Sequence, residues 1–207
     1  KQTHLPTSVP LEVPTIAHMN AGKPSGLVRT VHQELERIIR PGDLCIDATV
    51  GNGYDTLALA KLAGKDGVVF GFDIQEVALE RTRKLLEHHQ CIRSTQLFHA
   101  CHSNLAERIP SKFKKQIRVT LFNLGYLPKS DRQIVTQKES TVQAIKEAYC
   151  WLREGGLLSV LVYRGHPGGT EEARAIEALI EEKDWKNLKF VGKGSSTSPI
   201  LNLIEKD

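Results

Sequence analysis

Apolar and polar positions alternate with two different periods along the chain. Short apolar runs, often β-branched, have the length of buried strands, and they lie at Leu44–Ala48, Val68–Phe72, Gln96–His99, Val119–Asn123, Leu157–Tyr163, Leu188–Val191 and Ile200–Ile204. Between most of them apolar residues recur at helical spacing, which predicts helices over Asp55–Ala63, Gln75–His89, Ser103–Ile109, Glu139–Arg153 and Thr170–Glu182. One more helix is predicted before the first strand, with Ser25 as its N-cap and Pro41-Gly42 at its end.

This order of elements predicts the α/β fold class. Strands that alternate with helices form right-handed βαβ units, and hence a mostly parallel sheet with helices on both faces. Only the short polar segment 193–196 joins the last two strands, so we expect them to pair antiparallel at one edge of the sheet. Residues 1–24 hold four prolines without periodicity and are expected to form an extended arm, which leaves 25–207 as a single domain.

Composition is that of an ordinary globular domain. The chain has 207 residues, 40% of them hydrophobic and 25% charged, and a formal net charge of +4, which argues against disorder. No apolar run approaches the roughly 18 residues of a membrane span. The four cysteines form no CxxC pair, which argues against a disulfide scaffold or a structural zinc site and favours a reducing compartment.

The turn after the first predicted strand carries the strongest indication of a ligand. Gly51 and Gly53 permit backbone angles and a close ligand approach that a Cβ would prevent, and we expect Asp55 to cap the next helix. Asp73 ends the second strand, about 20 residues after Gly53 in the sequence. An acidic residue at that separation typically accepts a hydrogen bond from a ribose diol. Asp47 could orient the turn or accept from the ammonium of a cofactor. A plain strand-to-helix turn, with Asp73 as a helix cap, is the alternative.

The third position of the glycine motif bears on the ligand class. A dinucleotide fingerprint needs a third glycine, and Thr56 stands at that position. The residue weakens the case for NAD and favours S-adenosylmethionine, which keeps the ribose and adds a carboxylate but has no phosphate.

The fourth predicted strand ends in an element that we interpret as an acceptor site. Asn123 can accept an N–H bond from an amine, and Tyr126 can stack on a base, so the pair resembles the Asn-Pro-Pro-Tyr element of amine-directed nucleic-acid methyltransferases. A turn residue beside a packed aromatic ring is the alternative. His166, in the loop after the fifth strand, is a candidate proton acceptor, although a structural histidine is the commoner case.

Two further groups of residues allow a functional interpretation and a purely structural one. Histidines and cysteines before and after the third strand do not share a strand face, so we expect no metal site from His88, His89, Cys91, His99, Cys101 and His102. Basic residues flank the fourth strand, where they form either a solvated face or a contact for an RNA backbone near Asn123. These residues are Lys112, Lys114, Lys115, Arg118, Lys129 and Arg132.

Five segments taken in order carry a family resemblance. They are DATVGNGYDT at 47–56, GFDIQ at 71–75, HS at 102–103, FNLGYLP at 122–128 and YRGHPG at 163–168. The chain resembles the small class I methyltransferases that were first labelled rRNA methylases and later assigned as tRNA 5-aminomethyl-2-thiouridine methyltransferases. It departs from their pattern after Pro128, where a glycine pair is usual and Lys129-Ser130-Asp131-Arg132 stands instead.

The resemblance implies a Rossmann-like, seven-stranded methyltransferase fold with S-adenosylmethionine as the methyl donor. It further implies methylation of the aminomethyl nitrogen on the wobble uridine of tRNA, and therefore contact with the anticodon region. By this resemblance Asn52, Gly53 and Tyr54 hold the methionine end of the cofactor. Its ribose and adenine are held by Asp73, Gln75, Cys101 and His102, and the acceptor amine is oriented by Asn123 and Tyr126.

Several alternatives stay open at this point. An rRNA or other amine-directed methyltransferase, an NAD-dependent oxidoreductase and a non-catalytic RNA-binding module all fit parts of the pattern. Because family members occur in bacteria and in plant plastids, we expect either the plastid stroma, for a processed plant protein, or the cytoplasm. We expect no membrane partner, and a homodimer is a further option.

Overall fold

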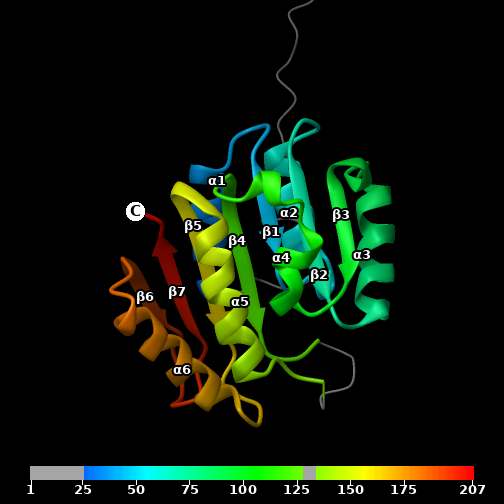
Figure 1. Cartoon of the computed structure of the whole chain (residues 1–207). Coiled ribbons are helices and arrows are strands. Elements are labelled where there is room, and N and C mark those ends of the chain that lie inside the picture. The colour runs from blue at the N-terminus through cyan, green and yellow to red at the C-terminus, as the bar shows by residue number, and fades with distance from the viewer. Residues whose placement is uncertain (1–25, 128–133) are drawn as a thin grey trace, which may run out of the picture.

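The computed structural model describes residues 26–127 and 134–207, which form a seven-stranded sheet between two layers of helices (Figure 1). The strands are β1 (Leu44–Asp47), β2 (Val68–Asp73), β3 (Thr95–His99), β4 (Ile117–Leu124), β5 (Leu152–Val162), β6 (Asn187–Val191) and β7 (Ile200–Glu205). The α-helices are α1 (Gly26–Ile38), α2 (Tyr54–Ala63), α3 (Glu76–His88), α4 (Leu105–Arg108), α5 (Lys138–Trp151) and α6 (Gly169–Glu182). The predicted α/β class is confirmed, whereas the expected arm at 1–24 and the N-cap Ser25 lie outside the described residues.

The strand order determines where a ligand can bind. The order across the sheet is β3-β2-β1-β4-β5-β7-β6. Strands β1 to β5 pair in parallel, and β7 runs antiparallel to both β5 and β6. The predicted antiparallel pair at one edge is thus confirmed, with β7 the reversed strand and β6 outermost. Chain order reverses between β1 and β4, and open sheets of this kind bind ligands at the carboxyl ends of the strands beside such a reversal.

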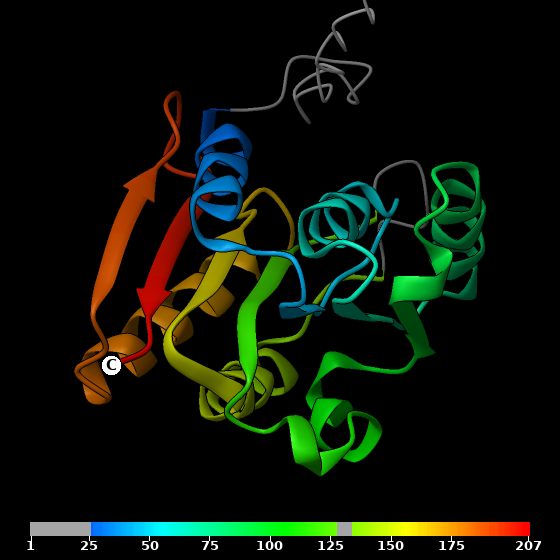
Figure 2. The same ribbon diagram turned by 90° about the horizontal axis from the view of Figure 1, so that it is seen from above.

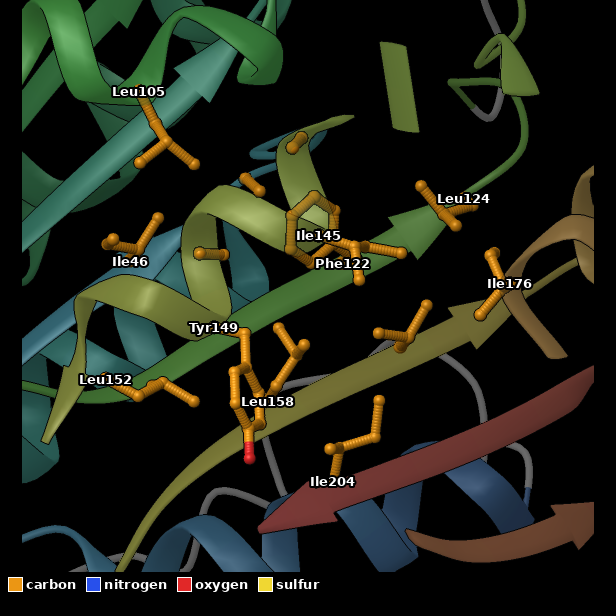
Figure 3. Packing of buried hydrophobic residues seen from close by; sticks show 14 of the residues in the cluster. Ile46, Leu105, Phe122, Leu124, Ile145, Tyr149, Leu152, Leu158, Ile176 and Ile204 are labelled. Carbon is orange, nitrogen blue, oxygen red and sulfur yellow. The ribbon is translucent and has the colours of Figure 1, made fainter. Parts of the chain in front are cut away.

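Alternate residues of β1, β2, β4, β5 and β7 pack into two separate cores. Ile46 and Phe122 pack with α4, α5 and α6 on one face, where Figure 3 shows Ile145 and Tyr149 of α5 above Phe122 and β5. Cys45 of β1 packs with α1, α2 and α3 on the other face, and the two helix layers are separated in the view from above (Figure 2). Burial of each large side chain contributes about 1.5–3 kcal/mol, so helix cover on both faces holds the strand ends rigidly.

One predicted helix end was wrong. The helix predicted over Glu139–Arg153 ends at Trp151, because Leu152 already pairs with Ile117 of β4 as the first residue of β5. Gly155 and Gly156 follow the predicted end, where glycines are typical of a helix stop, but they lie inside β5. A Cβ on Gly156 would lie 2.8 Å from the Arg153 carbonyl oxygen, so this glycine permits a tight bend of the strand.

Three predicted helix starts also differ. Gly53, with φ 82°, precedes α2, so Asp55 is not its cap but lies in its first turn. Gly168, also at φ 82°, precedes α6 in place of Thr170. The helix expected over Ser103–Ile109 divides into a 3₁₀ turn at His102–Asn104 and the four-residue α4. Glycine at a positive φ serves at two of these positions because it alone adopts that conformation without strain.

No helix in the described part of the chain combines the length and the apolar character that a bilayer crossing requires.

Candidate active site

A cavity of about 410 Å³ opens at the carboxyl ends of β1, β2 and β4. Every residue that the sequence predicted for cofactor or acceptor binding lines it, with the exception of Asp47. Those residues are Gly51, Asn52, Gly53, Tyr54, Asp73, Gln75, Cys101, His102, Asn123 and Tyr126. The structure therefore gathers the predicted set at the switch point of the sheet.

The glycine turn has the backbone conformations that its sequence predicts. Gly51 has φ 54° and Gly53 has φ 82°. A Cβ on Gly53 would lie 2.5 Å from Oγ1 of Thr82, whereas a Cβ on Gly51 would meet nothing closer than 3.5 Å. Gly53 is therefore required by packing as well as by its backbone angle, and the turn lies tightly against α3.

Asp73 joins the glycine turn to the end of β2. Its Oδ2 accepts a hydrogen bond from the Gly51 amide at 2.8 Å, and its Oδ1 accepts one from the Gln75 amide at 2.9 Å. Burial raises the pKa of Asp73, and the two amide donors oppose that rise. The carboxylate thus holds the turn and faces the cavity at the same time.

Asp47 is placed differently from the rest of the predicted set. It is fully buried, and its carboxylate accepts hydrogen bonds from the Thr56 hydroxyl at 2.6 Å and the Thr49 amide at 3.2 Å. Burial, followed by the nearby charge of Asp55, raises its pKa to about 7. Of its two expected roles, the geometry supports orientation of the turn. Thr56, which stands where a dinucleotide motif has glycine, is the residue that holds it.

His102 presents an unsatisfied nitrogen beside the cavity. The side chain is buried and its ring edge contacts Phe122, with centroids 5.7 Å apart. The ring is hydrogen-bonded to the backbone of Ala48, and burial lowers its pKa to about 4. Nε2 has no hydrogen-bond partner among the described residues. Near neutral pH the imidazole is therefore uncharged, and this nitrogen is available to a ligand. The neighbouring Cys101 accepts a hydrogen bond from the Ser103 hydroxyl at 3.2 Å.

Asn123 belongs to a chain of hydrogen bonds that the sequence did not predict. Its Nδ2 donates to Oδ2 of Asp55 at 2.7 Å, and Oδ1 of Asp55 lies 2.7 Å from Nε2 of His32 on α1. Asp55 lines the cavity, and its side chain is 21% exposed against 11% for His32. One sequence signal could have pointed to His32. It directly follows Val31 of the apolar stripe of α1, and both side chains are buried in the structure.

Aromatic residues form the other wall of the site. Tyr126 is 38% exposed and forms an isolated antiparallel bridge with Val135, next to the segment that the structure does not describe. Tyr163 begins the YRGHPG segment, which the sequence offered as a candidate lining of the acceptor pocket, and it does line the cavity. Burial together with the charge of Asp55 raises its pKa. It is therefore an uncharged phenol near neutral pH.

His166, the candidate proton acceptor, is not among the residues that line the cavity. Its ring is 6.4 Å from that of Tyr126, edge to face, and its Nδ1 lies 2.9 Å from the Pro167 carbonyl oxygen. A Cβ on Gly169 would lie 2.9 Å from its Nε2. This packing places the imidazole in the wall behind Tyr126, so the geometry favours the structural interpretation.

The expected position of the basic run was wrong. Residues 112–118 precede or begin β4, whereas Asn123 lies near its carboxyl end. Six residues of strand at about 3.3 Å each separate the two ends by roughly 20 Å. Arg118 also donates to the carbonyl oxygens of Ile38 and Gly155, and Lys114 lies 3.7 Å from Glu147. These residues face the opposite edge of the sheet, and Lys129 and Arg132 lie outside the described residues.

The histidines and cysteines around β3 do not converge. His99 lies 3.1 Å from a carboxylate oxygen of Glu76 and 2.9 Å from the carbonyl oxygen of Ile74. In the described ranges, no group of three or more His, Cys, Asp or Glu side chains has a geometry that could hold a metal ion.

Solved structures with this fold define the class of protein. A structure described as a "putative methyltransferase" from Streptococcus mutans, in complex with S-adenosylhomocysteine, is 33% identical, with a TM-score of 0.76 over 87% of this chain and 97% of that one. A structure described as a "putative rRNA-methylase" from Clostridium thermocellum is 34% identical, with a TM-score of 0.81 over 89% of this chain and 98% of that one. The protein is an S-adenosylmethionine-dependent methyltransferase. This finding replaces the NAD-dependent alternative.

The family is equally well defined. A family model described as "Putative rRNA methylase" matches residues 69–199. A curated protein of Arabidopsis thaliana, named "tRNA (mnm(5)s(2)U34)-methyltransferase, chloroplastic", is 39% identical, and the match covers 84% of this chain and 67% of that protein. The chain belongs to this family of methyltransferases, as the motif resemblance predicted.

Proposed function

We propose that this methyltransferase acts on tRNA and methylates the aminomethyl nitrogen of the wobble uridine in the anticodon. The name of the Arabidopsis relative supports the choice of acceptor. The observation that carries the proposal is the amide of Asn123, which the Asp55 carboxylate fixes in the wall of the cavity that Tyr126 also lines.

The cavity fits S-adenosylmethionine in its chemistry. Gly51 and Gly53 give the turn the positive φ angles with which it lines the cavity, and Asp73 offers a carboxylate for a ribose diol. The unsatisfied Nε2 of His102 is an acceptor, which suits the amino group of an adenine. Asn52 and Tyr54 would hold the methionine end, and Gln75 and Cys101 the adenine side. When bound, the cofactor supplies an electrophilic methyl group on its sulfonium.

Asn123 would orient the acceptor amine. A carboxylate only accepts hydrogen bonds, so the amide end that contacts Asp55 must be the NH₂ group, and the carbonyl end is left for the acceptor. Tyr126 supplies a ring on which the uracil base can stack. Methyl transfer depends mainly on such positioning, because the nitrogen lone pair must lie in line with the breaking bond.

A second groove supports an RNA substrate. It has a volume of about 500 Å³, and Arg164, Arg174 and Lys189 line it together with Glu177, which pairs with Lys189 at 2.6 Å. It lies at the carboxyl end of β5, one residue past Tyr163, on the same edge of the sheet as the first cavity. A polynucleotide with one base in the cavity could therefore place a phosphate against Arg164 and Arg174.

Transfer of a labelled methyl group tests the substrate. Purified protein is incubated with labelled S-adenosylmethionine and either tRNA or rRNA from cells that lack the enzyme. We expect label on tRNA, and a loss of at least about tenfold in rate for Asn123→Ala because positioning is lost. Label on rRNA alone would favour the rRNA alternative. Calorimetry with S-adenosylmethionine shows whether the variant still binds the cofactor.

We further propose a plastid location for the protein and contact with the anticodon region, both by analogy with the Arabidopsis relative. A fluorescent fusion of the full-length protein in plant cells tests the first, and footprinting of bound tRNA tests the second. A homodimer stays a prediction. Leu188 and Val191 of the outer strand β6 are 66% and 55% exposed, which supports it, and light scattering of the purified protein measures it directly.

A further inference from the structure

Asp55 has so far only the role of fixing the Asn123 amide, yet two residues from distant parts of the chain hold its carboxylate in place. The first turn of α2 carries it into the space between α1 and β4. One of its carboxylate oxygens contacts His32, and the other accepts from Asn123, both at 2.7 Å. With its side chain 21% exposed, the carboxylate still reaches the cavity.

The proposed acceptor needs such a group. An aliphatic amine with a pKa near that of lysine, ~10.4, is less than about 0.1% unprotonated at pH 7, and a protonated nitrogen has no lone pair with which to attack a methyl group. The site must therefore attract a cation and then remove a proton from it. A carboxylate beside the amide that orients the acceptor satisfies both requirements.

We propose that Asp55 binds the protonated aminomethyl group of the acceptor and accepts its proton, and that His32 is a positioning residue that holds the carboxylate for this step. The inference rests on the proposed function, since it assumes an aliphatic amine as the acceptor. The N–H bond breaks, its electron pair stays on nitrogen, and the proton passes to the free lone pair of Asp55. That nitrogen pair forms the new N–C bond while the pair of the broken S–C bond stays on sulfur. The protonated Asp55 then releases its proton to solvent.

Each carboxylate oxygen has two lone pairs, so the contacts with His32 and Asn123 leave room for the amine. Those two contacts also fix the plane of the carboxylate. Other titratable groups that act on Asp55 or respond to its charge are His32 on α1, Asp47 on β1 and Tyr163 after β5. All three residues are present in wild type and in an Asp55 variant. Loss of the Asp55 charge also lowers the pKa values of Asp47 and Tyr163, so the pH profile of the variant is read together with its binding of the amine.

The test compares Asp55→Asn with wild type from pH 6.5 to 9.5, using tRNA that lacks the methyl group. We expect kcat to fall by about 10²–10⁴-fold at pH 7, and the deficit to shrink by up to about tenfold per pH unit as the free amine becomes available. Affinity for S-adenosylhomocysteine, measured by calorimetry, should stay within about twofold. Asp66→Asn, at an exposed turn, is the matched control and should behave as wild type.

His32→Gln keeps an N–H donor toward Asp55, and His32→Ala does not. We expect the glutamine variant to retain much more of kcat than the alanine variant, with KM for tRNA little changed in both. His88→Gln, at the exposed end of α3, is the control for the histidine series.

A binding experiment keeps the inference testable without turnover. The complex with S-adenosylhomocysteine is titrated with 5-aminomethyluridine and with 5-hydroxymethyluridine. Wild type should prefer the amine by about tenfold or more, and Asp55→Asn should lose that preference. An unchanged preference or an unchanged rate at pH 7 in the variant would overturn the inference, as would a loss of cofactor affinity, which would place Asp55 on the cofactor. A wild type that prefers the amine but leaves tRNA unmethylated would overturn the proposed function alone.

Discussion

The glycine turn allows a prediction in which two neighbouring positions control for each other. Gly51 and Gly53 both have a positive φ, but only at Gly53 would a Cβ collide with a neighbour, at 2.5–2.9 Å from three atoms of Thr82. An alanine at either position meets the left-handed penalty of about 1–2 kcal/mol, offset by about 0.4–1 kcal/mol from the stiffer unfolded chain. Gly53→Ala adds overpacking, which costs about 1–3 kcal/mol.

We therefore expect Gly51→Ala to lower the free energy of unfolding by about 1 kcal/mol, and Gly53→Ala to lower it by about 2–4 kcal/mol. Urea unfolding of the ligand-free protein, followed by circular dichroism, measures both, and unchanged m values would show that the comparison is valid. Thr82→Ala in the Gly53→Ala background removes two of the three colliding atoms. It should recover at least about 1 kcal/mol relative to the sum of the single effects.

Equal losses for the two alanine variants, or no recovery in the double variant, would refute the steric argument. The backbone angle alone would then explain the need for glycine at both positions. A larger loss for Gly51→Ala would contradict the placement of the turn against α3.

Buried ionisable groups give three further predictions. Asp47 has a raised pKa of about 7, so the folded state holds a proton that the unfolded state releases above about pH 4. Stability therefore falls as pH rises from 4 to 7. Asp47→Asn should flatten this fall in urea unfolding, and an unchanged dependence of stability on pH would contradict the prediction. His102 has a lowered pKa of about 4, so stability falls as pH drops from 6.5 to 4. His102→Asn should remove up to about 3 kcal/mol of that fall in urea unfolding, and a fall of unchanged size in the variant would contradict this. Glu172 is buried and accepts hydrogen bonds from the hydroxyls of Thr136 and Thr141. Glu172→Ala should therefore lower the free energy of unfolding by about 2–4 kcal/mol. A loss no larger than that of Glu171→Ala, at the exposed neighbouring position, would show that these two hydrogen bonds do not stabilise the fold.

Local signals were sufficient for the sheet and for most of the cavity. Apolar runs of strand length predicted all seven strands, and the inner parallel strands require such runs because they are buried on both faces. The glycine turn and Asp73 were found because strand ends on one edge of a parallel sheet converge. The end of α5 was mistaken because Gly155 and Gly156 suggested a stop, whereas pairing of Leu152 with Ile117 determines where the strand begins.

What the sequence could not predict depends on tertiary distance. Asp55 meets His32 across 23 residues and Asn123 across 68 residues, so its first-turn position was taken for a helix cap. The basic run was placed beside Asn123 because the two are close in the chain, but the extended strand between them carries Lys112 and Lys115 to the opposite edge. Arg174, on the same edge as the cavity, is the better candidate for an RNA contact. Arg174→Glu should therefore weaken tRNA binding and reduce its salt dependence, and Lys115→Glu should not.

Mass spectrometry of wobble nucleosides tests the central claim most directly. tRNA is isolated from cells that lack the protein, from cells complemented with wild type and from cells complemented with Asn123→Ala. The account predicts that the unmethylated aminomethyl form of the wobble uridine accumulates without the protein, returns to the methylated form with wild type, and stays largely unmethylated with the variant. Unchanged wobble nucleosides in the absence of the protein would contradict the proposed substrate and reaction together.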